Sequence, residues 1–344
     1  KNQEAKMKFE LNTVQSEAMR KLLQDAGSND PSVAIKSQRE LAKAIETPLR
    51  KAVLSGDILS DIFSREDYTD GRIIQYPLDL LSPGKEGNYV AHVVPEQGKI
   101  PVNVVSSDSI LNIPTFRIGS AIGCSRKFLR DAQWNVIARM AEILEAAFVK
   151  KNNDSGFNVL ISSGVSRNVI AFDPDAAAGQ FTPRLITLMK NLMRRNGGGN
   201  SSSINRGKLT HLFISPEAKD DIRSWNLNLV SDQVRTNIYY TTDNGVEVMK
   251  IFDVELRDID ELGVGQEYQA YYTTTLGKAM PSGDTEIVVG IDKSKNDSFM
   301  NPVRENLQIF EDNTLHRENR FELYGSMEGG YASLDNRRVI LGSL

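Results

Sequence analysis

The chain has 344 residues, 40% of them hydrophobic, which is enough to bury substantial cores in about two domains. Its formal net charge of −4 comes from 41 basic and 45 acidic residues that are well mixed along the chain, which argues against tight binding of nucleic acid. Cys124 is the only cysteine, so an intramolecular disulfide and a cysteine-based zinc site are excluded. No apolar run approaches the roughly 18 to 20 residues of a membrane span, and none is expected.

The first sixty residues have the pattern of a jointed helical arm. A weakly amphipathic helix over residues 6–23 is followed by the breaker run GSNDP at residues 27–31. A second helix is predicted over 37–46, and a third begins at Thr47 as N-cap with Pro48 in its first turn and ends at Gly56. Such an arm has too little apolar surface to fold alone, so we expect it to pack on the body or on a neighbouring chain.

A two-residue period replaces the helical one from residue 71 onward. Strands are predicted over residues 74–80, 89–94, 100–105 and 113–122, with turns at SPGKEGN (82–88) and PEQGK (95–99). Prolines 77, 95, 101 and 114 restrict these strands to an edge or a two-stranded ribbon. A free ribbon is marginal in water, so we expect another subunit to cover it.

Residues 123–151 then form one uninterrupted helical pattern. No proline or glycine occurs from Ser125 to Lys151. One face of this stretch carries a recurring set of apolar residues: Leu129, Ile137, Met140, Leu144 and Phe148. At 1.5 Å per residue this helix is ~40 Å long, so we expect it to act as a rigid structural support.

The run NNDSG at residues 152–156 is expected to end the helix and to begin a mixed α/β region. Helices are predicted from Thr182 and Pro183, and from Ser215 and Pro216 through about Trp225. Strands are predicted over residues 209–214, 245–252, 268–274, 286–291, 306–311, 320–325 and 337–341, with a turn at 327–330.

Residues with catalytic chemistry are few. His92, His211 and His316 lack metal-ligand spacing, and Cys124 has no catalytic signature around it. The glycine-rich runs match no phosphate-binding motif. We therefore predict no catalytic residue, cofactor or metal site. The alternative from another class is a cytoplasmic α/β hydrolase that uses Cys124 or His211.

The order of these parts, namely helical arm, ribbon, long helix, α/β region and closing strands, resembles the major capsid protein of tailed bacteriophages. This is the Hong Kong 97-type α+β fold, which encapsulin nanocompartments share. Two stretches carry the resemblance further: HLFISPEAKDDIRSW at residues 211–225 is similar to a strand and helix of the axial domain, and GGYASLDNRRVILGSL at 329–344 to the last strands of the peripheral domain.

The resemblance implies four parts. They are an N-terminal arm (1–63), an extended β-hairpin loop (64–120), a peripheral domain with the spine helix (121–157 and 291–344) and an axial domain (158–290). It implies contacts between subunits through Tyr76, Leu78, Lys85, Pro95, Glu96, Lys99, Arg126 and Arg130.

The implied function is self-assembly, as hexamers and pentamers, into an icosahedral virion shell around double-stranded DNA, in the cytoplasm of a bacterial host. Implied partners are portal, scaffolding or protease, and decoration proteins. An encapsulin-like compartment that packages enzyme cargo is the alternative within the fold.

Two further expectations come from the resemblance. Some relatives join a loop Lys to an Asn by a cross-link with a Glu nearby, for which Lys85, Lys99, Asn313 and Asn319 are the candidates here; ordinary surface residues are the other interpretation. Relatives also often lose an N-terminal segment on maturation, so we expect the encoded protein to begin before Lys1.

Overall fold

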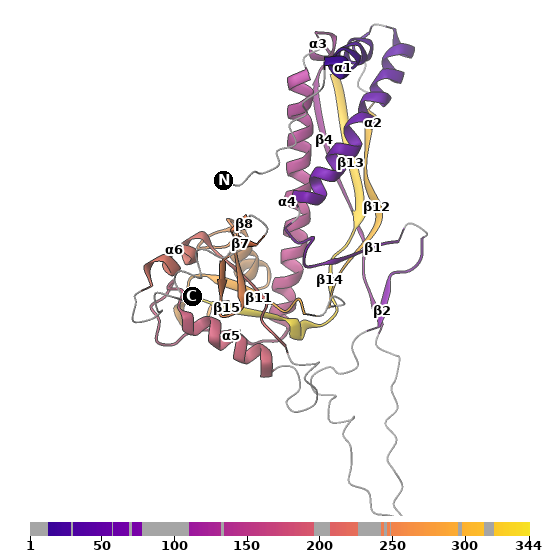
Figure 1. Cartoon of the computed structure of the whole chain (residues 1–344). Coiled ribbons are helices and arrows are strands. Elements are labelled where there is room, and N and C mark those ends of the chain that lie inside the picture. The colour runs from indigo at the N-terminus through magenta and orange to yellow at the C-terminus, as the bar shows by residue number, and fades with distance from the viewer. Residues whose placement is uncertain are drawn as a thin grey trace, which may run out of the picture. The chain divides into compact units, whose positions relative to one another are not determined.

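A computed structural model describes residues 13–28, 30–56, 58–68, 71–77, 110–131, 134–195, 207–225, 242–243, 246–247, 249–294, 298–312 and 320–344. The chain forms two compact units (Figure 1). Unit 1 comprises Lys1–Ile74, Ile113–Gly156 and Asn301–Tyr331, and unit 2 comprises Gln75–Asn112, Phe157–Met300 and Ala332–Leu344. Helices and sheets both occur in quantity, so the predicted α+β class is confirmed.

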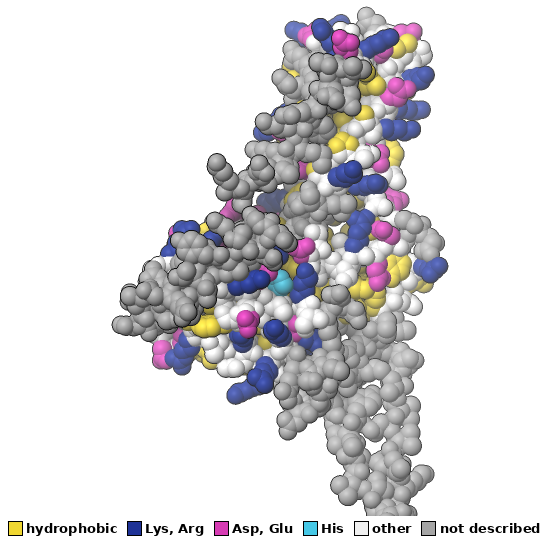
Figure 2. All heavy atoms as spheres, viewed as in Figure 1, with side chains coloured by type: hydrophobic (Ala, Val, Ile, Leu, Met, Phe, Trp, Pro, Cys, Tyr) yellow, Lys and Arg dark blue, Asp and Glu magenta, His cyan; other side chains and the backbone are white. Residues whose placement is uncertain are grey.

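Charged side chains of both signs are interspersed on the surface. On the face drawn in Figure 2, basic and acidic side chains are mixed over the described residues. Ion pairs such as Arg139 with Glu142 and Lys219 with Asp258 are exposed or half exposed. Such pairs contribute little to stability, so the two hydrophobic cores must hold the units together.

A long antiparallel sheet is the centre of unit 1. Its strands are β1 (Ser64–Asp67), β12 (Phe299–Asp312), β13 (Arg320–Gly329) and β4 (Phe116–Ser125), in that order. β13 and β4 pair along their whole length, from Arg320 opposite Ser125 to Gly329 opposite Phe116. β14 (Ala332–Ser333) also pairs with the beginning of β12.

Helices cover one face of this sheet. They are α1 (Thr13–Ala26), α2 (Pro31–Gly56), α3 (Arg126–Arg130) and the first part of α4 (Trp134–Ser166); Figure 1 shows α2 and α4 running along the strands. Leu41 and Ile45 of α2 meet Leu144 and Phe148 of α4 in one core, to which the sheet contributes Leu307, Ile309, Phe321 and Leu323. The first helices therefore bury their apolar stripe against the body of their own chain.

The second and third predicted helices of the arm are one helix. α2 continues through Pro48 to Gly56, so the prediction of a break at Thr47 was wrong. Leu41, Ile45, Leu49 and Val53 are all at most 4% exposed, and their spacing keeps one stripe on the sheet on both sides of the proline. This burial outweighs the hydrogen bond that Pro48 cannot donate.

The long helix differs from its prediction at both ends. Residues 123–125 belong to β4, α3 is separate from α4, and α4 runs on to Ser166 instead of ending at NNDSG. Gly156 is buried, and a Cβ there would lie 2.1 Å from Leu59 Cδ1, so its small size serves close packing. The turn propensity of the run is overridden by tertiary contacts that a local pattern does not contain.

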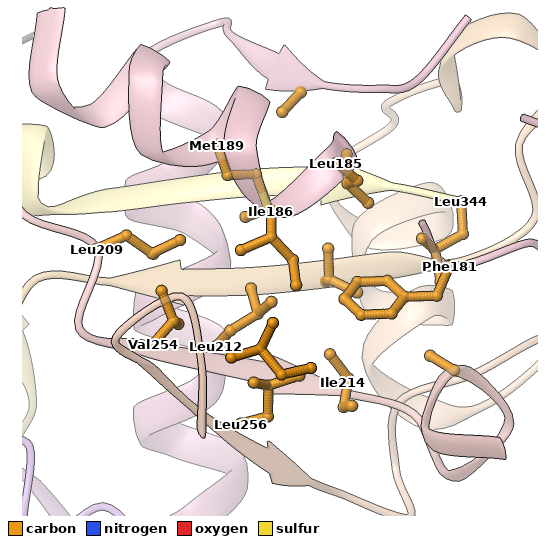
Figure 3. Close-up of a cluster of buried hydrophobic side chains, with 14 of the residues drawn as sticks. Phe181, Leu185, Ile186, Met189, Leu209, Leu212, Ile214, Val254, Leu256 and Leu344 are labelled. Carbon is orange, nitrogen blue, oxygen red and sulfur yellow. The ribbon is translucent and has the colours of Figure 1, made fainter. Parts of the chain in front are cut away.

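A mixed sheet forms the centre of unit 2. Its order is β5 (Ile170–Ala171), β15 (Val339–Ser343), β11 (Ile287–Ile291), β6 (His211–Ile214), β10 (Val254–Asp258) and β9 (Met249–Ile251). β5 and β15 are parallel, as are β6 and β10, while the other neighbours are antiparallel. Side chains of α5 (Pro183–Arg195) and α6 (Pro216–Ser224) complete the core, which Figure 3 shows closing around Phe181, Ile186, Leu212 and Leu256.

Both predicted helix starts in unit 2 are confirmed. The Thr182 hydroxyl accepts a hydrogen bond from the Leu185 amide at 3.3 Å, and the Ser215 hydroxyl accepts one from the Ala218 amide at 3.1 Å. Proline follows each cap at the first helical position, where its missing donor costs nothing.

The predicted strand over residues 268–274 is helical. The segment forms α8 (Glu267–Ala270) and a π-helical turn, η2 (Tyr271–Thr275). Tyr268 and Tyr272 are each 1% exposed and lie four residues apart, so one helical face buries both. The aromatic and β-branched composition favoured a strand, and burial decided otherwise.

Most of the remaining strands are confirmed with shifted ends. The strand predicted over 245–252 is divided between two sheets, and residues 78–80 of the strand predicted over 74–80 lie outside the described residues. β12 and β13 are longer than predicted, and β13 continues through the expected turn at 327–330 as far as Gly329. β15 follows a short 3-10 turn, η6 (Asn336–Arg338), and β4 begins three residues later than predicted. β2 (Gln75–Pro77) pairs with β3 (Ile110–Asn112), and β7 (Thr242–Asp243) with β8 (Val246–Glu247). The strands predicted over 89–94 and 100–105 lie outside the described residues.

Candidate assembly surfaces

The long sheet of unit 1 carries an exposed aromatic pair on the face opposite its core. Phe310 of β12 lies directly across from Tyr324 of β13, and their rings stack with centroids 5.3 Å apart and planes 26° apart. Phe310 is 37% exposed and Tyr324 is 40% exposed. Tyr324 in turn pairs with Ala121 of β4, so an apolar row crosses three strands. A rigid aromatic patch of this kind is what protein interfaces use as an anchor.

Beside this pair, small residues of β4 leave the surface of the sheet without projecting side chains. Gly119, Ala121 and Gly123 alternate along the same face of β4. A Cβ at Gly123 would lie 2.5 Å from Glu322 Cγ, so the Glu322 side chain occupies the space above that glycine. The face therefore offers an aromatic anchor next to a low strip of backbone.

A signal for the aromatic pair is present in the sequence. Strand alternation puts Leu307 and Ile309 into the core, which sends the adjacent Phe310 to the other face. Leu323 and Tyr324 repeat this arrangement on β13. When two consecutive residues are apolar in a strand with one buried face, one of the two must lie on the exposed face. The register that brings the two rings together is set by the pairing of β12 with β13.

Three of the predicted contact residues lie in the described part of the chain. Tyr76 is 7% exposed and lies opposite Leu111 in the β2–β3 pair. Arg126 donates a hydrogen bond to the Ser28 carbonyl at 2.6 Å and so ties α3 to the connection between α1 and α2. Arg130 is exposed. The other predicted positions, namely Leu78, Lys85, Pro95, Glu96, Lys99, Asn313 and Asn319, lie outside the described residues.

A buried charged cluster organises the end of the chain in unit 2. Asp292 is fully buried, forms an ion pair with Arg338 and accepts hydrogen bonds from the Lys208 amide at 2.9 Å and the Ser294 amide at 2.9 Å. Asp335 Oδ1 forms an ion pair with Arg337 Nε at 2.8 Å. Burial by itself raises the pKa of Asp335, but the hydrogen bonds and charges of Arg337, with the charge of Arg338, outweigh it and hold this pKa below its ordinary value.

A second buried carboxyl lies at the start of α6. Glu286 is 4% exposed and accepts a hydrogen bond from the Ser215 hydroxyl at 2.6 Å. Burial raises the pKa of Glu286; the Ser215 hydrogen bond opposes this rise, and the charges of Glu217 and Asp221 add to it. The carboxyl is therefore held in a setting that disfavours its charged form.

The two described residues considered for hydrolytic chemistry have ordinary packing roles. Burial raises the pKa of the Cys124 thiol to about 11, so at neutral pH it is protonated and a poor nucleophile. His211 is 9% exposed in β6, with Nδ1 2.9 Å from the Thr210 hydroxyl and Nε2 3.6 Å from Glu255. His92 and His316 lie outside the described residues.

The described ranges contain no candidate metal site and no candidate membrane span. Within them, no three His, Cys, Asp or Glu side chains are grouped as metal ligands would be. Of the helices in those ranges, none combines the length and the apolar composition of a bilayer crossing.

Comparison with known proteins gives a match at the level of the fold. No protein-family model matches the sequence, and no curated protein is similar to it. Among solved structures, one from Microbacterium phage Oxtober96 has a TM-score of 0.56 at 10% identity and covers 84% of this chain and 90% of that chain. The capsid asymmetric unit of cyanophage Pam1 has a TM-score of 0.52 at 12% identity, over 86% of this chain and 92% of that one. The capsid of an empty GTA particle has a TM-score of 0.51 at 9% identity, over 84% and 90%.

These matches cover more than four fifths of the chain and define its fold. The chain has the Hong Kong 97-type fold of phage major capsid proteins, which confirms the resemblance seen in the sequence.

Proposed function

We propose that this protein is the shell-forming subunit of a phage-like capsid. The observation that carries the proposal is the capsid fold itself, which extends over more than four fifths of the chain in each comparison. In this proposal copies of the chain assemble as hexamers and pentamers into an icosahedral shell that encloses double-stranded DNA. The protein acts through its surfaces and not through a catalytic site.

The exposed surfaces of unit 1 support this role. The Phe310 and Tyr324 pair is exposed apolar surface on an open sheet face, which a neighbouring chain would bury in the assembly. Many weak contacts of this kind add up when each subunit touches several neighbours, because every further contact within a closed lattice is intramolecular. A slightly acidic chain also suits a container that must release its genome.

The extended loop and the start of the spine helix are proposed as further contacts. Tyr76, Arg126 and Arg130 are the described members of this set, and Leu78, Lys85, Pro95, Glu96 and Lys99 complete it. Portal, scaffolding or protease, and decoration proteins are the proposed partners from the same virus, and the proposed location is the virion capsid.

The four-part division expected from the sequence is proposed on the same basis. The arm, extended loop, peripheral domain and axial domain would be the parts through which subunits meet. A cross-link from Lys85 or Lys99 to Asn313 or Asn319 would appear on a denaturing gel of boiled particles as ladders of linked subunits, whereas monomers alone would exclude it.

The contents of the particles test the proposal. Particles purified from infected or expressing cells, treated with nuclease and then opened, should release protected double-stranded DNA when the packaging proteins of the same virus are present. Particles that contain a defined protein cargo and no DNA would instead identify a compartment of the encapsulin kind. A homogeneous monomer with hydrolytic activity that depends on Cys124 or His211 would contradict both.

A further inference from the structure

Unit 1 contains a small cavity with a mainly apolar lining and several polar side chains, where α2, α4, β1, β12 and β13 meet. Its volume is about 30 Å³. Ten residues line it: Arg50, Val53, Arg65, Asn152, Asn301, Val303, Asn306, Leu307, Met327 and Tyr331. Two arginines and three asparagines are thus among the lining residues, and Arg65 already donates to Asn306 Oδ1 and, at 3.3 Å, to Asp67 Oδ1.

One atom of this lining lacks the partner that its chemistry requires. Asn152 is 5% exposed, and its amide nitrogen makes only a weak contact with Met327 Sδ at 3.8 Å. No donor among the described residues reaches the buried Asn152 Oδ1. A buried acceptor without a donor is costly, and native proteins satisfy almost all such atoms with protein groups or ordered water.

The chemistry of the lining selects the occupant. Asn152 Oδ1 has only lone pairs, so the occupant must donate a hydrogen bond, which an unprotonated anion cannot do. The exposed Arg50 has only donors, so an occupant that reaches it must also accept, and the charge of the guanidinium disfavours a cation. A neutral group that both donates and accepts meets these demands.

Size then decides among neutral groups. A cavity of about 30 Å³ has room for an ordered water molecule, the smallest such group. We propose that the cavity binds an ordered water that donates to Asn152 Oδ1 and accepts from an arginine at the opening. This water would link α2, which carries Arg50, to α4, which carries Asn152.

Two substitutions at Asn152 test the proposal on the full chain. Asn152→Leu removes the acceptor and expels the water, so Tm should fall by roughly 2 °C. Asn152→Asp keeps an acceptor of the same shape that faces two arginines, so at neutral pH its Tm should stay at or above that of Asn152→Leu. If the cavity is dry, the order reverses: Asn152→Leu removes an unsatisfied acceptor and raises Tm, whereas Asn152→Asp adds a buried charge that no donor reaches and lowers Tm.

Direct observation and ligand titration complete the test. A structure at a resolution that shows ordered waters should contain density within hydrogen-bond distance of Asn152 Oδ1 and of one guanidinium; an empty cavity would overturn the proposal. A rise in Tm with added inorganic phosphate that Arg50→Gln abolishes would show that the occupant is an anion, and would also overturn it. None of these outcomes depends on whether the protein forms shells.

Discussion

At the scale of single residues, the buried charges of unit 2 are the positions where substitution should matter most. Asp292 is enclosed by Arg338 and by two backbone amides, so every part of its charge is compensated inside the protein. Removing Asp292 leaves the buried Arg338 with Asp335, at 3.5 Å, as its carboxylate partner and removes the acceptor of two backbone amides.

Asp292→Ala should therefore lower the free energy of unfolding by about 3 to 5 kcal/mol. Asp220→Ala is the matched control, because Asp220 forms an exposed pair with Arg223 one turn along α6, and it should change stability by less than about 0.5 kcal/mol. Urea denaturation of both variants measures the difference. Equal losses of unfolding free energy in the two variants would mean that the buried Asp292 ion pair stabilises the protein no more than the exposed one.

Glu286 should make stability depend on pH in the opposite sense to an ordinary paired carboxylate. Its pKa is raised by burial, so the folded state binds a proton more readily than the unfolded state does. Its favourable contribution is complete below the unfolded value of about 4.3 and is lost as the pH rises through the raised pKa of the folded state.

Glu286→Gln, which is neutral at every pH, should thus be more stable than the wild type at pH 7, and the two should converge near pH 4. Chemical denaturation at a series of pH values measures this. A constant difference across the series would show that the charge of Glu286 carries no penalty.

At the scale of elements, the path of α4 depends on one glycine. A Cβ at Gly156 would meet Leu59, which is fully buried and cannot move away without opening the core. Alanine would gain about 1 kcal/mol of helix propensity in isolation, but overpacking costs about 1 to 3 kcal/mol.

Gly156→Ala should therefore destabilise the protein or leave it unchanged, against the expectation from propensity. The double variant with Leu59→Ala should lose less than the sum of the two single changes, because the smaller side chain makes room for the new methyl group. Additive losses would mean that the two residues do not contact one another.

The elements also show where sequence patterns are sufficient. The cap and proline pairs at Thr182 and Ser215 fix helix starts locally, and the strands of the closing segment follow from their apolar alternation. Local propensity predicted a break before Pro48, a helix end at NNDSG and a strand in the tyrosine-rich segment after residue 267. Each of these predictions was wrong, because buried side chains from distant parts of the chain decide the structure there. The aromatic pair on the open sheet face required the strand register, which no single segment contains.

At the scale of the whole molecule, the open face of the long sheet should act in assembly and not in folding. Tyr324→Ser removes the exposed ring and breaks the stack with Phe310. Truncating an interface anchor typically costs about 2 kcal/mol of binding. We expect the variant to form fewer particles at a given concentration, while Tyr324→Phe, which keeps the ring, assembles normally.

Sedimentation through a density gradient measures the particle fraction, and denaturation of the unassembled chain measures stability. A variant that assembles like the wild type would remove this face from the interface. Loss of both assembly and stability would assign the aromatic pair to the fold.

Electron microscopy of the purified full chain tests the central claim most directly. The capsid fold predicts closed shells of uniform size, whose reconstruction contains sixfold and fivefold clusters of this chain. A protein that stays monomeric by light scattering and microscopy across concentration and salt, with its fold intact, would contradict the claim that this chain builds a shell.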